Sequence, residues 1–326
     1  SSCESGEILA IIVGNEKFGE ITVEDTYEID KVKRITNIFG TYDTTDPETQ
    51  ILLKRLGKLA VSGTYELDFD EVKNIKELIQ NTKEAMGAQK ITGIMMNAKP
   101  FHRAHERLVR IALEKCDLLV IFLLKPYKMD GFSYDLRMRS LRYFADNYLP
   151  RNRVLIVPFE NTYIFAGHNN TVLESIAAYN FGCNKIVLGQ NHSGIGMYFD
   201  QNQMHSILDK YKSDLPLETV IVSEFVYCNE CRALMSTKTC PHGQHHHIKY
   251  HSESLKALLK EGILPPSVLM RKDISAILLS ELFPNRFKNI QKIYDDIFPN
   301  AGLLESHDEK DFYLELMNLY QTTSLT

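Results

Sequence analysis

From Ile91 onward, short apolar runs of strand length alternate with longer stretches in which apolar residues recur at helical spacing. The strands predicted from this pattern are residues 91–96, 118–124, 153–157, 185–189 and 219–222. The helices predicted between them are residues 103–115, 133–147, 171–181 and 200–212. Strands separated by helices of this length predict an α/β fold with a parallel sheet covered on both faces. Ligands of such sheets bind at the carboxyl ends of the strands, so the loops after strands are the places to search.

The two ends of the chain follow other patterns. In the first 90 residues we expect a strand at 7–13, a charged helix at 26–39 and helices at 51–56 and 70–86. After Tyr227 comes an insert rich in cysteine and histidine, and then predicted helices at 252–261, 273–282 and 289–319. The chain therefore divides into three predicted domains, residues 1–90, 91–226 and 227–326.

Composition and charge narrow the class of protein. The 326 residues are 44% hydrophobic and 24% charged, which excludes a disordered or collagen-like chain. Lys and Arg number 37 against 42 Asp and Glu, a net charge of −5, so no nucleic-acid partner is expected. No apolar run approaches the roughly 18 residues of a membrane span. Ser1-Ser2-Cys3-Glu4 lacks the basic start of a signal peptide, and we expect a cytoplasmic protein.

The first chemical motif is Pro100-Phe101-His102-Arg103-Ala104-His105-Glu106, which follows the strand at 91–96 and opens a helix. His102 and His105 are three residues apart, so they share one face of that helix. A helix N-terminus favours phosphate, and two imidazoles there can donate hydrogen bonds that strengthen as charge builds in a transition state. The alternative is a pair of surface or capping histidines, but the strand–loop–helix position favours a binding role.

A second motif, Gly189-Gln190-Asn191-His192-Ser193-Gly194, directly follows the strand at 185–189. Gly189 and Gly194 let the backbone approach a ligand closely, and the backbone N–H groups together with His192 could hold a nucleotide. Glycine-rich loops after strands are common, so this motif alone is weak support for nucleotide binding. The support is stronger when the motif is taken together with the histidine pair.

The third motif is Cys228-x2-Cys231-x8-Cys240-Pro241-His242-Gly243-Gln244-His245. Three thiolates and one imidazole suit a closed, tetrahedral structural zinc site. The fourth ligand could be His242, His245, His246 or His247, and we expect His245 because the tight Cys-Pro-His turn would point His242 away. Free cysteines remain the alternative, and a catalytic zinc is disfavoured because four protein ligands leave no open position. A further set, Arg137, Arg139 and Arg142, is expected on a solvated helix face, with at most part of it facing an anion.

Together these residues resemble the ATP sulfurylase (sulfate adenylyltransferase) family, over about residues 7–284. The anchors are residues 100–106, Ala166-Gly167, 180–183, 189–194 and 236–242. The resemblance implies a Rossmann-like nucleotidyltransferase domain, a PUA-like α+β domain before it, shortened in this chain, and a small zinc-bearing, helical C-terminal lobe.

The family reaction joins ATP and sulfate to give adenosine 5′-phosphosulfate and pyrophosphate, with Mg²⁺ accompanying ATP. By position, His102 and His105 match the histidines that stabilise the transition state. Residues 189–192 match the nucleotide loop, and Ser193 matches a position whose backbone N–H meets sulfate. Asn97 is assigned to ATP binding, and Lys99 joins the histidines as a catalytic residue.

The chain departs from the family where sulfate is held. The family's Gln-x-Arg-Asn becomes Met96-Asn97-Ala98-Lys99, its Gly-Arg-Asp-His becomes residues 189–192 (GQNH), and its Ala-Gly-Pro-Arg-Glu becomes residues 166–170 (AGHNN). An arginine cannot become alanine without loss of a paired anion contact. Lys99 offers one charge in return and a protonated His168 a second, but neither provides a bidentate fork.

Four functions remain open on these residues. The first is adenylyl transfer from ATP to sulfate, with Lys99 and the backbone replacing the arginine. The second is the same chemistry with another acceptor, less charged or larger. The third is a catalytically silent relative that binds a nucleotide or a protein. The fourth and weakest is RNA binding through the PUA-like part. Sulfate is the default acceptor, the partners are small molecules, and a homo-oligomer is compatible with all four.

Overall fold

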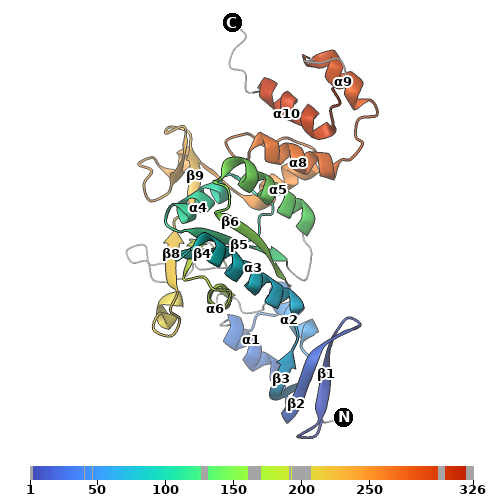
Figure 1. The fold of residues 1–326 in the computed structure, drawn as a ribbon, viewed down its shortest axis with the longest axis vertical. Helices are drawn as coiled ribbons and strands as arrows, with labels where there is room; N and C mark the ends of the chain where they lie inside the picture. The colour runs from blue at the N-terminus through green and yellow to red at the C-terminus, as the bar shows by residue number, and fades with distance from the viewer. Residues whose placement is uncertain are drawn as a thin grey trace. The chain divides into compact units, whose positions relative to one another are not determined.

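The computed structural model describes residues 3–39, 41–45, 47–125, 131–160, 170–190, 192, 207–299 and 305–320. The chain forms two compact units, each built from segments that are separated in the sequence. The first unit comprises residues 1–87, 163–182 and 191–217, and the second comprises residues 88–162, 183–190 and 218–326. Figure 1 shows the fold, with labels on many of its helices and strands. The three consecutive domains 1–90, 91–226 and 227–326 stay a prediction.

A five-stranded parallel sheet lies in the second unit. Its strands are β4 (Ile91–Met96), β5 (Leu118–Lys125), β6 (Val154–Glu160), β7 (Lys185–Gly189) and β8 (Glu218–Val222). Their order is β6-β5-β4-β7-β8, and every neighbouring pair is parallel. The chain proceeds outward from β4 to β6 and then resumes on the other side of β4. The strand order therefore reverses between β4 and β7, the position at which sheets of this kind bind ligands.

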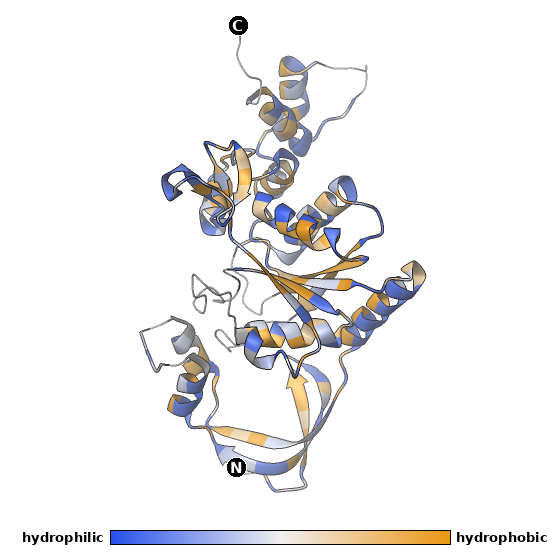
Figure 2. Cartoon of the chain, turned by 90° about the vertical axis from the view of Figure 1, so that its left-hand side faces the viewer, coloured by the Kyte–Doolittle hydropathy of each residue, from blue (hydrophilic) through white to orange (hydrophobic). Residues whose placement is uncertain are grey.

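The core of this unit forms because the inner strands β4 and β5 carry apolar side chains on both faces. All six residues of β4 are buried, and the first six of β5 are also buried. Helices α4 (Arg103–Glu114) and α5 (Tyr134–Tyr148) add apolar residues such as Val109 and Phe144 to the same cluster. Figure 2 shows these strands mainly in the orange of hydrophobic residues. Burial of each such side chain contributes about 1.5–3 kcal/mol, so this cluster is a main source of stability.

The predicted α/β fold with a parallel sheet is confirmed. All five predicted strands are present, with ends that differ from the prediction by at most a few residues. The helices predicted at 103–115 and 133–147 correspond to α4 and α5, and the one at 171–181 corresponds to α6 (Asn170–Asn180) of the first unit. Of the helix predicted at 200–212, residues 200–206 lie outside the described residues, and Ile207–Tyr211 form a 3₁₀ helix, η3.

The rest of the second unit holds a small antiparallel sheet and four helices. The sheet has the order β10-β9-β11, with β9 at Phe225–Cys228, β10 at Ala233–Ser236 and β11 at His247–Lys249. The helices are α7 (Ser252–Lys260), α8 (Lys272–Leu282), α9 (Ile290–Ile297) and α10 (Glu309–Tyr320). The single helix predicted at 289–319 is wrong. Pro299 follows α9 closely, and proline does not continue a helix.

The first unit contains an antiparallel sheet of order β1-β2-β3. Its strands are β1 (Ile8–Val13), β2 (Glu16–Glu28) and β3 (Leu59–Leu67), and its helices include α1 (Lys31–Phe39), α2 (Pro47–Arg55) and α3 (Asp70–Met86). The helix predicted at 26–39 is wrong in its first residues, because Thr26–Glu28 pair with β3. The helix begins only after Asp30, whose Oδ1 accepts a hydrogen bond from the Lys33 N–H at 2.9 Å. A PUA-like domain here stays a prediction.

In the described residues, none of the helices combines the length and the apolar character that crossing a membrane requires.

Replacing Ile121, which lies in β5 with 0% exposure, by alanine is expected to lower the free energy of unfolding by about 2–5 kcal/mol. The physical reason is the cavity left between close-packed strands and helices. Urea titration followed by circular dichroism measures the change. The matched control is Ile297→Ala at the end of α9, where the side chain is half exposed and a much smaller loss is expected. Equal losses in the two variants would contradict the placement of the core.

Candidate functional site

The chain passes from β4 to α4 through a turn that contains three of the predicted site residues. Asn97 is exposed, Lys99 is half-buried, and His102 is buried immediately before the helix. Between them, Ala98 is buried and has φ of 50°, in the left-handed region that alanine rarely adopts. Because such a conformation persists only where the surroundings impose it, the path of this turn is fixed by packing around it.

The histidines of the first motif lie against each other at the start of α4. The rings of His102 and His105 stack with centroids 3.8 Å apart and planes at 24°. The backbone N–H of His102 donates to Nδ1 of His105 at 3.2 Å. Since that nitrogen accepts, a neutral His105 carries its proton on Nε2. The turn therefore fixes the tautomer and leaves Nε2–H as the donor.

Two residues at and just before the start of α7 contact His102. Its Nε2 lies 3.2 Å from Oγ of Ser252, and its ring stacks on Tyr250 with centroids 5.5 Å apart. Its Nδ1 is buried, and none of the described residues forms a hydrogen bond with it. A buried polar atom without a partner is costly and uncommon. This nitrogen is therefore an open hydrogen-bonding position inside the protein.

Burial keeps both imidazoles neutral. It lowers the pKa of His102 well below the ordinary 6.5, and a charge on His105 would lower it further. Burial also lowers the pKa of His105 to about 4. Near neutral pH the pair therefore offers hydrogen-bond donors and acceptors but no net charge.

Glu106, the last residue of the motif, connects α4 to the segment before α8. Its carboxylate is buried and accepts from Nε of Arg271 at 2.9 Å and Nη1 of Arg103 at 3.3 Å. The backbone N–H of Arg103 donates to the carbonyl of Leu269 at 3.0 Å. Two arginines on one buried carboxylate make a charge-assisted link that holds the first turn of α4 in place.

The second motif is described only in part. The backbone N–H of Gln190 donates to the carbonyl of Val222 at 2.8 Å, which continues the pairing of β7 with β8. A Cβ added at Gly189 would meet no atom of the described residues within 4 Å, so their packing does not require glycine there and leaves space beside it. Asn191 and Ser193 lie outside the described residues, as do Ala166, Gly167 and His168.

His192 lies in the first unit, where it meets a carboxylate that the sequence did not single out. Its Nε2 is 2.5 Å from Oε2 of Glu174 in α6, and the other oxygen of Glu174 accepts from Nδ2 of Asn170 at 3.1 Å. Glu174 is buried, so this pairing supplies its main described contacts. A buried glutamate four residues into a helix gives no sequence signal that distinguishes it from an exposed one.

Arg137 contradicts the expectation of a solvated face. Its side chain is 1% exposed, and Nη1 donates to the carbonyls of Asn97 at 2.7 Å and Leu124 at 2.9 Å. Arg139, two residues on, is exposed and forms an ion pair with Glu281. Residues two apart lie on different sides of a helix, so the same charge points inward at one position and outward at the other. The sequence shows which positions of α5 are charged, but it does not show which face of the helix packs against the core.

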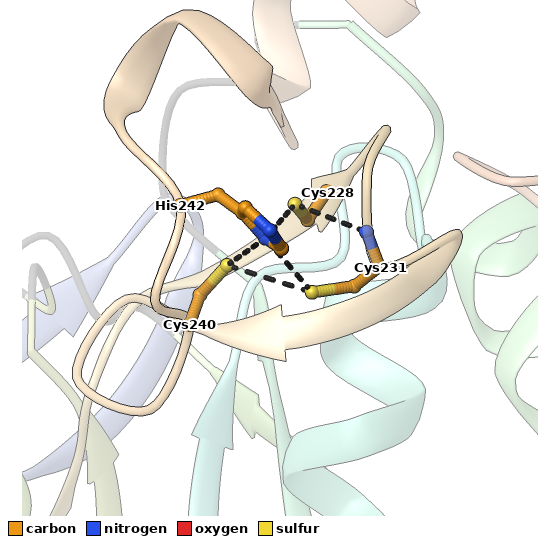
Figure 3. A group of neighbouring side chains, drawn as sticks. All are labelled: Cys228, Cys231, Cys240 and His242. Carbon is orange, nitrogen blue, oxygen red and sulfur yellow. Dashed lines mark hydrogen bonds between the residues drawn. The ribbon is translucent and has the colours of Figure 1, made fainter.

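The third motif converges on one point of the small sheet. Figure 3 shows Cys228, Cys231, Cys240 and His242 directed toward one another. The four ligand atoms lie within 4.8 Å of one another, and Nδ1 of His242 is 3.2 Å from Sγ of Cys231 and 3.5 Å from Sγ of Cys228. Three thiols and one imidazole at such distances match the donor set of a tetrahedral structural zinc site.

The fourth member of this cluster differs from the prediction, because the structure brings His242 and not His245 to the three sulfur atoms. The turn through Pro241 directs His242 back toward the cysteines. His245 lies in the short 3₁₀ helix η4 (Gln244–His246) and packs on His246, with ring centroids 4.1 Å apart. Its ring also lies against Gly243, where an added Cβ would come within 2.9 Å of it.

A family model for ATP-sulfurylase matches residues 70–281, well over half of the chain. The chain belongs to the ATP-sulfurylase family. The resemblance drawn from the sequence motifs is thereby confirmed.

Curated relatives support the same family at modest identity. The sulfate adenylyltransferase of Psychrobacter cryohalolentis is 29% identical over 288 residues, which cover 85% of this chain and 69% of the relative. The sulfate adenylyltransferase of Persephonella marina is 26% identical over 278 residues, which cover 81% of this chain and 71% of the relative. Both names denote enzymes of the nucleotidyltransferase class, which confirms that part of the prediction at the level of the family.

Among solved structures, a chain described as hexameric APS kinase from Thiobacillus denitrificans has the same fold. It superposes with a TM-score of 0.60 at 15% identity. The alignment covers 85% of this chain and 49% of the solved chain, so the present chain spans about half the length of that protein. At this identity the likeness concerns the fold alone.

The lowered pKa values of the two histidines predict an acid-sensitive fold in this ATP-sulfurylase family member. Below pH 6.5 the unfolded chain binds protons that the folded His105 resists down to about pH 4. The free energy of unfolding should therefore fall across this interval, by up to about 3 kcal/mol for His105.

Urea titrations between pH 4.5 and 7.5 measure the fall in the free energy of unfolding. The His105→Gln variant lacks the part of this fall that comes from His105. Other acid-sensitive groups, including the Cys/His cluster, are present in both proteins, so the difference between the two profiles reports the contribution of His105. Profiles that run parallel would show that His105 is not buried as described.

Proposed function

We propose that the protein transfers the adenylyl group of ATP to sulfate, forming adenosine 5′-phosphosulfate and pyrophosphate. The main support is the stacked pair of neutral histidines at the end of β4, in a chain that belongs to the ATP-sulfurylase family. The pair lies at the carboxyl end of a parallel strand beside the reversal of strand order, where sheets of this kind bind their ligands.

In the reaction, an acceptor oxygen attacks the α-phosphorus of ATP and pyrophosphate departs. The protein contributes positions and hydrogen-bond donors rather than covalent chemistry. His105 donates from Nε2, because its Nδ1 is occupied by the backbone N–H of His102. His102 offers its unpaired Nδ1. Donors fixed before the reaction stabilise the charge that develops on the phosphate oxygens without reorganising.

The remaining predicted residues have roles that rest on the family resemblance. Asn97 and Lys99 belong to the turn after β4, and Lys99 supplies a positive charge for the acceptor or the phosphates. Residues 189–193 would hold the nucleotide, with Gln190 and Asn191 replacing charged family residues. The open space beside Gly189 supports a close approach of ligand to backbone. Mg²⁺ would reach the site on the phosphates of ATP, since the only group of three or more metal-ligating side chains in the described residues is the Cys/His cluster.

Another acceptor is the second candidate, and the turn after β4 favours it in one respect. The family position for the sulfate-binding arginine is Ala98, whose buried methyl group carries no charge. A dianion held without a bidentate cation binds weakly. A less charged acceptor would tolerate this replacement.

The Cys/His cluster is proposed to bind a structural zinc ion through Cys228, Cys231, Cys240 and His242. A closed set of four ligands would fix the small sheet β10-β9-β11 and, through the chain that follows it, the start of α7 with Ser252. A cytoplasmic location and a homo-oligomeric state stay predictions.

The reaction is tested by pyrophosphate release from ATP in the presence of sulfate, phosphate, phosphonates and small organic acids. Sulfate is expected to support release. His102→Ala is expected to reduce the turnover by about 10²-fold or more, because one transition-state donor is lost.

The matched control for this assay is His307→Ala. His307 stacks on a tyrosine ring, Tyr294, as His102 stacks on Tyr250, but it is half-buried and lies in the segment just before α10. It should retain turnover, and circular dichroism should show that both variants fold. Release with another acceptor but not with sulfate would favour the second candidate, and ATP binding without release would favour a silent relative.

The metal site is tested by elemental analysis of protein purified without chelator. One zinc per chain is expected in the wild type and in His245→Ala, whereas Cys231→Ser and His242→Ala should lose most of it. Chelation should also lower the midpoint of thermal unfolding. Absence of zinc in the wild type, or its loss in His245→Ala alone, would contradict the assignment.

A further inference from the structure

Helix α5 begins with two donor side chains on one face. Ser133 caps the helix by accepting from the backbone N–H of Leu136 at 3.2 Å. Tyr134 and Arg137 follow, three residues apart, so their side chains are neighbours on the helix surface. The guanidinium carbon of Arg137 lies 5.7 Å from the centroid of the Tyr134 ring.

Arg137 is buried with part of its guanidinium unused. Nη1 reaches the carbonyls of Asn97 and Leu124, which places the head group at the carboxyl ends of β4 and β5. Nε and Nη2 are buried and have no hydrogen-bond partner among the described residues. These two nitrogens are adjacent on the guanidinium and form the edge that arginine uses to bind an oxyanion through two parallel hydrogen bonds.

Tyr134 adds a third donor to this place. Its hydroxyl is buried and likewise has no hydrogen-bond partner in the part of the chain that the structure describes. Burial raises the pKa of Tyr134 to about 12, so the hydroxyl keeps its proton and can donate. The ammonium group of Lys125, at the end of β5, lies 5.4 Å from the centroid of the same ring and 2.6 Å from Oε1 of Glu160.

In the part of the chain that the structure describes, no carboxylate forms an ion pair with Arg137, and Glu160, at the end of β6, is paired with Lys125. A buried cation without a partner is strongly unfavourable, and so is each unpaired buried donor. All the unsatisfied atoms at this point are donors, so the partner that would satisfy them is an anion with at least two acceptor oxygens.

We propose that Tyr134 and Arg137 form an oxyanion subsite at the carboxyl ends of β4 and β5, which binds one tetrahedral phosphate or sulfate group of the substrates. The inference deepens the proposed function and rests on it for the identity of the anion. Arg137 would also supply, from α5, a bidentate arginine contact. The family has such an arginine in the turn after β4, where this chain has Ala98. Because the donors are enclosed, binding includes a local rearrangement around the first turn of α5.

The subsite is tested by calorimetric titration of the protein with sodium sulfate, pyrophosphate and ATP, without turnover. Tyr134→Phe removes only the hydroxyl and should weaken the binding of at least one of these anions by about tenfold. Its free energy of unfolding should not fall, because the hydroxyl lost is buried and unpaired. Arg137→Lys keeps the charge but loses the fork, and should weaken the same anion by at least as much. The matched control is Arg139→Gln, which should bind within about twofold of the wild type because this arginine is exposed.

The pattern of losses separates the two sources of the anion. Weaker binding of sulfate alone assigns the subsite to the acceptor, and weaker binding of ATP and pyrophosphate assigns it to the nucleotide. Unchanged affinity for all three in Tyr134→Phe and Arg137→Lys overturns the proposal, as does a loss of stability in Tyr134→Phe with unchanged affinity. Pyrophosphate release is measured separately, so a wild type that binds anions through these residues but releases nothing would refute the proposed function and leave the subsite standing.

Discussion

The buried strand β4 is the constraint on which the candidate site depends. All six of its residues are buried, and it pairs with β5 on one side and β7 on the other, so neither its register nor its direction can change without exposing apolar surface. Its carboxyl end therefore delivers Asn97, Ala98 and the histidine pair to a fixed position. The left-handed conformation of Ala98 is tolerated because both sides of the turn are anchored, one by the sheet and the other by α4.

Contacts from the C-terminal part of the second unit complete this anchoring. Ser252 and Tyr250 meet His102, and Arg271 meets Glu106. Residues about 150 or more positions apart in the chain thus share one small volume around the first turn of α4. The proposed zinc ion would fix the small sheet directly before the segment that contacts His102, so it would help to position the site without taking part in the chemistry.

Unsatisfied buried polar atoms are the common feature of the described site. Nδ1 of His102, the outer edge of Arg137 and the hydroxyl of Tyr134 are all enclosed and unpaired. Stable proteins pair such groups almost without exception, and the exceptions gather where a ligand supplies the missing partner. In the proposed function and subsite, Arg137 would neutralise an anionic group that the substrates already carry, whereas the two neutral imidazoles would donate to charge that develops only during the reaction.

The sequence by itself determined the α/β fold, the five strands, the family and the convergence of three cysteines. Apolar runs, helical spacing and Cys-x-x-Cys are local patterns, and local patterns are what a sequence displays. It failed for the helix expected at 26–39, whose first residues join a strand because β3 lies across from them. It also failed at 289–319, where Pro299 separates two helices.

Only the tertiary structure decided that His242 rather than His245 faces the sulfur atoms, that Arg137 points inward, and that Glu174 meets His192. Each of these depends on the direction in which a side chain leaves its element and on what lies opposite, and that is set by packing between segments far apart in the chain.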